Sequence, residues 1–373
     1  MLILLRNPSY FLERSPLMPT LSPLTLRKWL RKFIIVFLCF GFIITYYHYR
    51  SSSERHHPRV VNIGYLRVPN DEMLAISQDS IKQALAKENI NVHFTVFDSG
   101  VEANQALASK SIDFASMGIT NGVIAMSKNL PVELIWIHEI LGTNEGLVVK
   151  DNQNIHSLSD LKGKTLATTF ASTSHFSLQK TLESQGLQKD ITLLDMKSTD
   201  IMAAWQRGNI DGVYTWEPTL NNIQKQGGLT LLTSKDLAEA GYPTANIMVG
   251  RKDFITDHPN ITQTLLQCLS EAKTFYHQQP DQAAQQIAKA LEISPELAQL
   301  QMSGADWLSL DQEKQYLSNP TQPGKIFDVL KNISQFLYQT HILPKEVTDE
   351  TIHQFINGHL LENLTEKGGE QHE

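Results

Sequence analysis

From residue 60 onward, short apolar runs rich in β-branched residues alternate with longer amphipathic stretches, which predicts strands separated by helices. A loop is predicted at 118–121, before a short helix at 122–127. In the first stretch of the chain, strands are predicted at 60–66, 92–97, 114–117 and 133–138. This alternation favours parallel sheets with right-handed crossovers.

A second, similar set begins after 147–150, and a strand at 246–250 leads back to the first. Its strands are predicted at 165–168, 191–195 and 212–216, and its helices at 158–163, 200–207 and 218–226, with a polar loop at 172–174 that opens a helix toward residue 185. One α/β unit inserted in another, joined by two crossing strands, predicts a two-lobed α/β binding protein with its ligand in the cleft.

The expected division gives lobe I residues 60–145 and 247–364, and lobe II residues 146–246. Beyond residue 253 the chain is predicted to be mostly helical, with regular apolar spacing in 261–275 and 326–337. The tail at 365–373 is expected to be disordered.

The N-terminal residues 1–59 carry a different pattern. An apolar and aromatic stretch at 33–47 follows four basic residues, the layout of a signal peptide or signal anchor, and a polar linker follows. No A-x-A-like cleavage site follows the stretch, so both alternatives stay open. The basic residues before it place the N-terminus in the cytoplasm and the folded part across the inner membrane.

Composition narrows the function classes. The chain has 373 residues, 41% of them hydrophobic and 19% charged, as in ordinary globular proteins. Its net charge of −7 conceals an asymmetry, because residues 60–373 hold 23 basic and 37 acidic residues. That balance argues against a nucleic-acid-binding surface. Two cysteines cannot form a disulfide framework or a cysteine zinc site.

Three strand-to-helix loops carry candidate binding residues. In the first, glycines at 118 and 122 allow a ligand close to the backbone, and Thr120 and Asn121 supply polar groups. The second offers Ser172, Thr173, Ser174 and His175 at a helix start, a pattern suited to an oxyanion with several acceptors. Simple capping of the helix by Ser or Thr is the alternative for this second loop.

The third loop follows the strand at 212–216. Trp216 is a candidate wall of the ligand pocket, or a core tryptophan. Glu217 is a candidate partner for a cationic group, or a surface or capping residue. Trp205, in a predicted helix, is expected to pack in the core.

Several segments resemble the sulfonate- and taurine-binding branch of the solute-binding proteins of ABC transporters, in the NMT1/THI5-like superfamily. They are FDSG at 97–100, DLKGK at 160–164, STSHFSL at 172–178 and AAWQRGNIDGVYTWEP at 203–218. The last is the most specific, and the resemblance extends from about residue 60 to about residue 355. It implies a type II periplasmic-binding-protein fold that closes on a small sulfonate, taurine or an alkanesulfonate, in the periplasm.

The resemblance also implies an ABC permease and ATPase as partners, a monomer, and neither cofactor, metal nor catalytic residues. In the family's pattern an aspartate stands where this chain has Asn246, and a small residue often stands where it has Glu217. Asn246 is therefore another candidate ligand contact. Either the carboxylate that holds an amine lies across the cleft, or the ligand carries no amine.

Two other functions compete with transport. Pyrimidine synthases of thiamine biosynthesis resemble the same superfamily but carry a cysteine-rich motif, whereas this chain has one cysteine beyond residue 60. A membrane-tethered sensor or binding module for another small organic anion, or for a thiamine-pyrimidine precursor, is the second alternative. Sequence does not separate such a sensor from a transport protein.

Overall fold

The computed structural model describes residues 58, 60–151, 154–318 and 324–365, all of which belong to one of the two units into which the chain divides, residues 58–373. The apolar stretch at 33–47, the polar linker before residue 58 and the tail beyond residue 365 lie outside the described residues. Among the helices that are described, none is both long enough and apolar enough to cross a bilayer.

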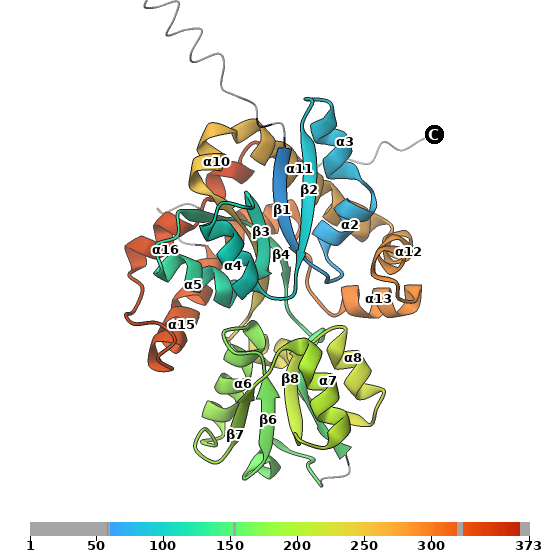
Figure 1. Ribbon diagram of the computed structural model, residues 1–373, viewed down its shortest axis with the longest axis vertical. Coiled ribbons are helices and arrows are strands. Elements are labelled where there is room, and N and C mark those ends of the chain that lie inside the picture. Colours follow the sequence, from blue (N-terminus) through green and yellow to red (C-terminus); the bar gives the residue numbers. More distant parts are fainter. Residues whose placement is uncertain (1–57, 59, 152–153, 319–323, 366–373) are drawn as a thin grey trace, which may run out of the picture. The chain divides into compact units, whose positions relative to one another are not determined.

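The first sheet has five strands in the order β2-β1-β3-β10-β4 (Figure 1). Strand β1 is parallel to its neighbours β2 and β3, whereas β10 is antiparallel to both β3 and β4. The strand bounds are β1 Val60–Leu66, β2 Asn91–Phe97, β3 Phe114–Gly118, β4 Val132–Ile140 and β10 Ala245–Arg251.

The second sheet also has five strands, in the order β7-β6-β8-β5-β9. Strand β6 is parallel to β7 and β8, and β5 is antiparallel to β8 and β9. The bounds are β5 Glu145–Lys150, β6 Thr165–Thr168, β7 Thr192–Asp195, β8 Gly212–Trp216 and β9 Gly228–Thr233. Strand β9 is not predicted from the sequence.

The expectation of parallel sheets is correct for β2-β1-β3 and for β7-β6-β8, but both sheets are mixed. The two exceptions, β5 and β10, are the strands that carry the chain from one sheet to the other. Each enters its new sheet at the end where the parallel strands finish, so it must run against them. Asn246 near the start of β10, for example, lies opposite Gly118 at the end of β3.

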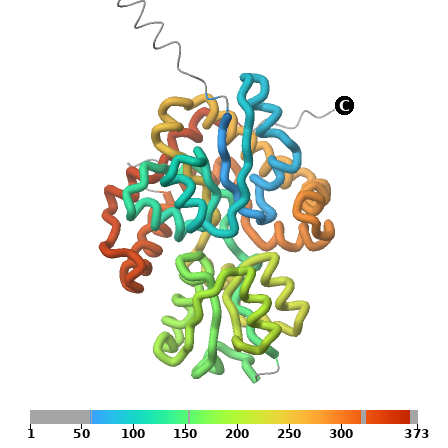
Figure 2. The backbone as a smooth tube through the Cα atoms, viewed as in Figure 1, coloured from blue at the N-terminus to red at the C-terminus, as the bar shows by residue number. Residues whose placement is uncertain are grey.

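Helices surround each sheet (Figures 1 and 2). We call the first sheet with its helices lobe I, and the second sheet with its helices lobe II. Lobe I has α2 Asp71–Ser77, α3 Ser80–Ala86, α4 Gly100–Ala108, α5 Ile119–Ser127, α10 Lys252–Asp257, α11 Pro259–Gln278, α12 Pro280–Leu291, α13 Pro295–Ser303, α14 Leu310–Tyr316, α15 Lys325–Gln339, α16 Asp349–Phe355 and the 3₁₀ turn η3 Gly358–Leu361. Lobe II has the 3₁₀ turn η2 Leu158–Leu161 and helices α6 Thr173–Ser184, α7 Ser198–Arg207, α8 Thr219–Gln224 and α9 Ser234–Glu239.

The C-terminal helices return to lobe I, as the helical pattern predicts. The apolar repeats at 261–275 and 326–337 fall in α11 and α15, whose buried faces join the core of the first sheet. The second sheet has two smaller cores, and Trp205 is buried in one of them. The prediction that Trp205 packs in the core is confirmed.

The lobes are joined by the segment 141–144, between β4 and β5, and by the residues that enter β10. The two connections lie side by side, since the Leu141 amide donates to the Thr244 carbonyl at 2.8 Å. The end of α13 packs against the first connection: a Cβ atom on Gly142 would lie 2.4 Å from the Gly304 carbonyl oxygen. Only glycine permits this close approach at position 142.

Candidate functional site

Gly118 lies where the two lobes meet. A Cβ atom at this position would lie 3.1 Å from the Thr173 methyl carbon, 3.7 Å from Asn121 Oδ1 and 3.8 Å from Asn246 Oδ1. Four elements therefore converge on Gly118, namely the end of β3, the first turn of α5, the start of β10 and the first turn of α6. We call this meeting point the seam. Three of the sequence-predicted residues, Asn121, Thr173 and Asn246, lie at it.

Helix α5 brings Asn121 to the seam and carries Thr120 in the same first turn. The expected loop at 118–121 is wrong, because Gly118 itself is the N-cap and the helix begins at Ile119. No side chain caps this helix, so the amides of its first turn have no intrahelical or capping partner. Thr120 is fully buried, and its Oγ1 has no hydrogen-bond partner among the described residues. This turn can therefore donate to a ligand.

Asn246 is hydrogen-bonded to a buried carboxylate. Its Nδ2 donates to Glu139 Oε1 at 2.5 Å, across the β10–β4 pairing. Glu139 is only 2% exposed, and within the described structure its second oxygen, Oε2, has no partner. Burial raises the pKa of Glu139 to about 7, against the opposing effects of His138 and Asn246. Sequence reasoning missed Glu139, although an acid within the apolar run VELIWIHEI is unusual enough to be noticed.

In the first turn of α6, Ser172 caps the helix, as the alternative to anion binding predicts. The Ser172 hydroxyl accepts from the His175 amide at 3.2 Å and donates to the Thr169 carbonyl at 2.6 Å. The next two hydroxyls, of Thr173 and Ser174, both donate to Glu145 Oε2, at 2.6 and 2.9 Å. Their hydrogens are thus directed into lobe II, and the donors this turn offers at the seam are backbone amides without intrahelical partners.

His175 packs across the lobes as a neutral ring. It stacks on Phe170 with ring centroids 4.3 Å apart and meets the edge of Phe336, from α15 of lobe I, at 5.5 Å. Its Nδ1 lies 3.3 Å from the Ala171 amide nitrogen, which donates to it. Burial lowers the pKa of His175 to about 4, so the ring is uncharged near neutral pH. It supplies contact between lobes and no positive charge for an anion.

Glu217 contacts both lobes without lying at Gly118. Its Oε2 accepts from Gln301 Nε2 of α13 at 2.8 Å and from the Asn221 amide of α8 at 3.3 Å. Burial raises the pKa of Glu217 to about 7. Trp216 is half-buried and lies opposite Glu145 in the β8–β5 pairing. Helix capping, one of the alternatives for Glu217, therefore accounts for the hydrogen bond from Asn221 but not for the one from Gln301.

A buried polar network lies behind the seam in lobe I. The Ser116 hydroxyl lies 2.7 Å from His138 Nε2, and His138 Nδ1 lies 2.6 Å from Asp71 Oδ1. Ser116, His138 and Asp71 are connected in the order of a Ser-His-Asp catalytic triad, but their hydrogens are not placed as a triad requires. Ser116 donates its hydrogen to Glu72 Oε2 at 2.5 Å. Although burial opposes it, the charge of Asp71 and the hydrogen bond that His138 donates to Asp71 raise the pKa of His138 to about 9. A protonated imidazole cannot serve as the general base.

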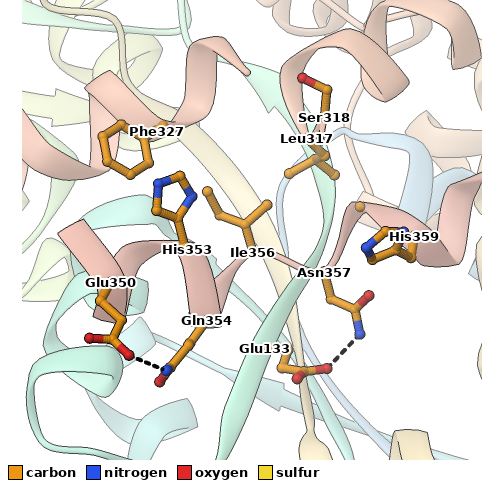
Figure 3. Close-up of a pocket in the computed structure, with 11 residues that line it drawn as sticks. Glu133, Leu317, Ser318, Phe327, Glu350, His353, Gln354, Ile356, Asn357 and His359 are labelled. Atoms are coloured by element: carbon orange, nitrogen blue, oxygen red, sulfur yellow. Dashed lines mark hydrogen bonds between the residues drawn. The ribbon is translucent and has the colours of Figure 1, made fainter. Parts of the chain in front are cut away.

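A separate pocket of about 720 Å³ lies in lobe I, between β4, α15 and α16 (Figure 3). His353 faces the Phe327 ring at 4.6 Å, and Asn357 Nδ2 donates to Glu133 Oε2 at 2.6 Å. None of the nine sequence-predicted residues lines it. Among the residues the structure describes, no group of three or more histidine, cysteine or acidic side chains could hold a metal ion.

Two mixed α/β lobes, linked by two crossing segments and meeting at the first turns of α5 and α6, define the class of two-lobed solute-binding proteins. The family model described as NMT1/THI5 like matches residues 85–283, more than half of the chain. The chain belongs to the NMT1/THI5-like family.

Comparisons with individual proteins agree with this family assignment. The chain is 31% identical over 276 residues to the taurine-binding periplasmic protein of Escherichia coli strain K12, a match that covers 71% of this chain and 82% of that protein. It is similar in structure to the periplasmic aliphatic sulphonate binding protein SsuA of Escherichia coli, with a TM-score of 0.67, 22% identity and coverage of 82% of this chain and 99% of the other.

A third likeness is to the desulfurization enzyme DSZB, with a TM-score of 0.58, 16% identity and coverage of 82% of this chain and 98% of the other. At such identities the structural likenesses establish the fold alone. They confirm the expected α/β, type II periplasmic-binding-protein fold.

Proposed function

We propose that this protein is the substrate-binding component of an ABC transporter and captures a small sulfonate, taurine or an alkanesulfonate. The observation that carries the proposal is the seam, where the first turns of α5 and α6 converge on Gly118 from opposite lobes. A sulfonate stays anionic at any physiological pH and accepts several hydrogen bonds. Neutral amide donors at helix starts hold such a group without a countercharge.

The proposal extends to an amine on the ligand. Glu139 is a buried carboxylate whose Oε2 has no partner among the described residues, beside an asparagine at the seam. A buried oxygen of this kind is costly unless a donor reaches it. An ammonium group at this point would satisfy it, which favours taurine among the two alternatives left by Asn246. Glu139, not Glu217, is then the carboxylate that holds the amine.

Function as a binding protein, and not as an enzyme, is the second part of the proposal. The Ser116, His138 and Asp71 cluster has the protonation opposite to that of a hydrolase, and Ser116 is only 2% exposed. We expect no turnover when the protein is incubated with taurine or ethanesulfonate and the products are followed by mass spectrometry.

The remaining parts of the proposal concern the whole chain. Lobe I is taken as residues 60–144 and 245–364 and lobe II as residues 145–244, within two residues of the division expected from the sequence, because β5 begins at Glu145 and β10 at Ala245. The protein acts in the periplasm as a monomer, held at the inner membrane through residues 33–47, and delivers its ligand to an ABC permease and ATPase. Neighbouring permease and ATPase genes distinguish this function from that of a tethered sensor.

Isothermal titration calorimetry of the purified protein tests the ligand class. Taurine and ethanesulfonate are expected to bind, whereas β-alanine, which replaces the sulfonate of taurine by a carboxylate, is expected to bind at least about tenfold more weakly. If none of the three binds, or if β-alanine matches taurine, the sulfonate assignment is wrong and the family likeness reports the fold alone.

A further inference from the structure

Glu145 is a buried carboxylate that stands behind the first turn of α6. It begins β5, directly after the connection at 141–144, and is 1% exposed. Three hydroxyls donate to it: Thr173 and Ser174 of α6 to Oε2, and Ser234 of α9 to Oε1 at 2.7 Å. A carboxyl group that accepts from three hydroxyls has the hydrogen-bond pattern of the ionised form.

Within the described part of the chain, no cation pairs with this charge. None of the ion pairs found among the described residues involves Glu145, and burial raises the pKa of its carboxyl above the ordinary value, although the three hydroxyl bonds lower it. Buried carboxylates are ordinarily paired with a cation. Among the described residues, the compensation comes from hydroxyls and from the positive ends of the helices that carry them.

The charge is close to the seam because Thr173 connects the two. Thr173 Oγ1 lies 2.6 Å from Glu145, and the methyl carbon of the same side chain lies 3.1 Å from where a Cβ of Gly118 would be. A ligand oxyanion at the seam would meet amide donors in front and one fixed negative charge a single side chain behind. The field of that carboxylate offsets part of the positive end of α6.

We propose that Glu145 is a specificity-determining residue that sets the seam to accept anions of one negative charge and to reject those of two. The inference rests on the proposed function. A monoanion such as a sulfonate gains its hydrogen bonds at a small electrostatic cost. For a dianion such as sulfate, the repulsion from Glu145 is twice as large, and the site is partly dry, so charges interact more strongly there than in water.

The test compares two ligands that share a tetrahedral sulfur–oxygen group and differ in charge, ethanesulfonate and sulfate. Calorimetry gives the ratio of their Kd values for the full-length protein, for Glu145→Gln and for Ser234→Ala. The glutamine variant keeps the shape and removes the charge. Ser234→Ala is the matched control, since it removes one hydroxyl bond to Glu145 and keeps the charge.

The wild-type protein is expected to prefer ethanesulfonate. Glu145→Gln should reduce that preference by about tenfold or more, mainly by binding sulfate more tightly, and Ser234→Ala should leave it within threefold of the wild type. Equal weakening of both ligands in Glu145→Gln would show that the carboxylate only packs. Equal effects of the two variants would show that charge is not the cause.

A second measurement needs no variant, should Glu145→Gln fail to fold. Ethylphosphonate gains its second negative charge as the pH rises through neutrality, whereas the charge of ethanesulfonate is constant. In the wild-type protein, ethylphosphonate should weaken relative to ethanesulfonate as the pH rises from 6 to 8.5. A constant ratio, or sulfate binding as tight as ethanesulfonate, overturns the inference alone. Failure of every sulfonate to bind overturns the proposed function as well.

Discussion

Replacement of Glu139 by glutamine should separate ligands that carry an amine from those that do not. The change preserves the shape of a side chain that is 2% exposed, and its amide oxygen can still accept from Asn246. What it removes is the negative charge and one acceptor at Oε2, which has no partner within the described structure. A charge-assisted hydrogen bond in such a site is worth about 1.5–3 kcal/mol, so the expected loss of taurine affinity is about 10- to 150-fold.

The assay is calorimetric titration at pH 8, where the Glu139 carboxyl, with its pKa of about 7, is mostly ionised. Ethanesulfonate has no amine, and its affinity should change by less than threefold. Glu217→Gln is the matched control, because Glu217 is also a buried carboxylate with a pKa near 7 but binds Gln301 and Asn221. It should not alter the ratio of the taurine and ethanesulfonate affinities.

The pH dependence of taurine affinity tests the role of Glu139 without a mutation. Below about pH 7 the Glu139 carboxyl gains a proton and loses the charge that attracts an ammonium. Taurine affinity should therefore fall by up to about tenfold for each pH unit below 7, while ethanesulfonate affinity stays nearly constant. Equal loss of both ligands in Glu139→Gln, or an amine-selective loss in Glu217→Gln alone, would refute the assignment of the amine to Glu139.

Three further outcomes follow from the structure. Gly118→Val should abolish measurable sulfonate binding, because a Cβ at this position already lies 3.1 Å from the Thr173 methyl carbon, and calorimetry would contradict this if affinity stayed within threefold. Ser172→Ala should lower the free energy of unfolding by about 1 kcal/mol through loss of the α6 cap, with little effect on affinity, as urea denaturation and titration would show. The free energy of unfolding should fall as the pH rises from 5 to 9. The folded-state pKa of Glu72 is raised to about 7 and that of His138 to about 9, so the stability each group contributes is lost as the pH rises through those values. Urea midpoints that are constant or increasing over this range would contradict the assignment.

Much of the fold could be predicted from the hydrophobic pattern, because the buried side chains of strands and of helices recur at different spacings along the sequence. The strand at 60–66 and the amphipathic helices around 261–275 and 326–337 match the structure closely. Strand direction could not be predicted in this way. An antiparallel crossing strand such as β10 has the same apolar composition as a parallel one, and its direction depends on which lobe the chain comes from.

The geometry of the candidate site was only partly predictable from the sequence. Polar residues at the starts of α5 and α6 indicated where a ligand would be held, and Asn121 and Thr173 do lie at the seam. The sequence could not indicate where each hydroxyl hydrogen points. Thr173 and Ser174 donate to a glutamate 28 and 29 residues earlier in the chain, a partner that only the folded β5 brings near.

The two acids that matter most at the seam share a reason for having been missed. Glu139 is the last residue but one of β4 and lies just beyond the strand predicted at 133–138, and Glu145 is the first residue of β5, so both lie at strand ends, where polar residues are common. The connection at 141–144 turns the chain between the lobes and leaves one carboxylate on either side, at 2% and 1% exposure. If both proposals hold, one boundary segment sets two properties of the ligand: Glu139 favours a positive amine, and Glu145 limits the negative charge at the other end. A zwitterion with a single negative charge, as in taurine, meets both conditions, whereas sulfate meets neither.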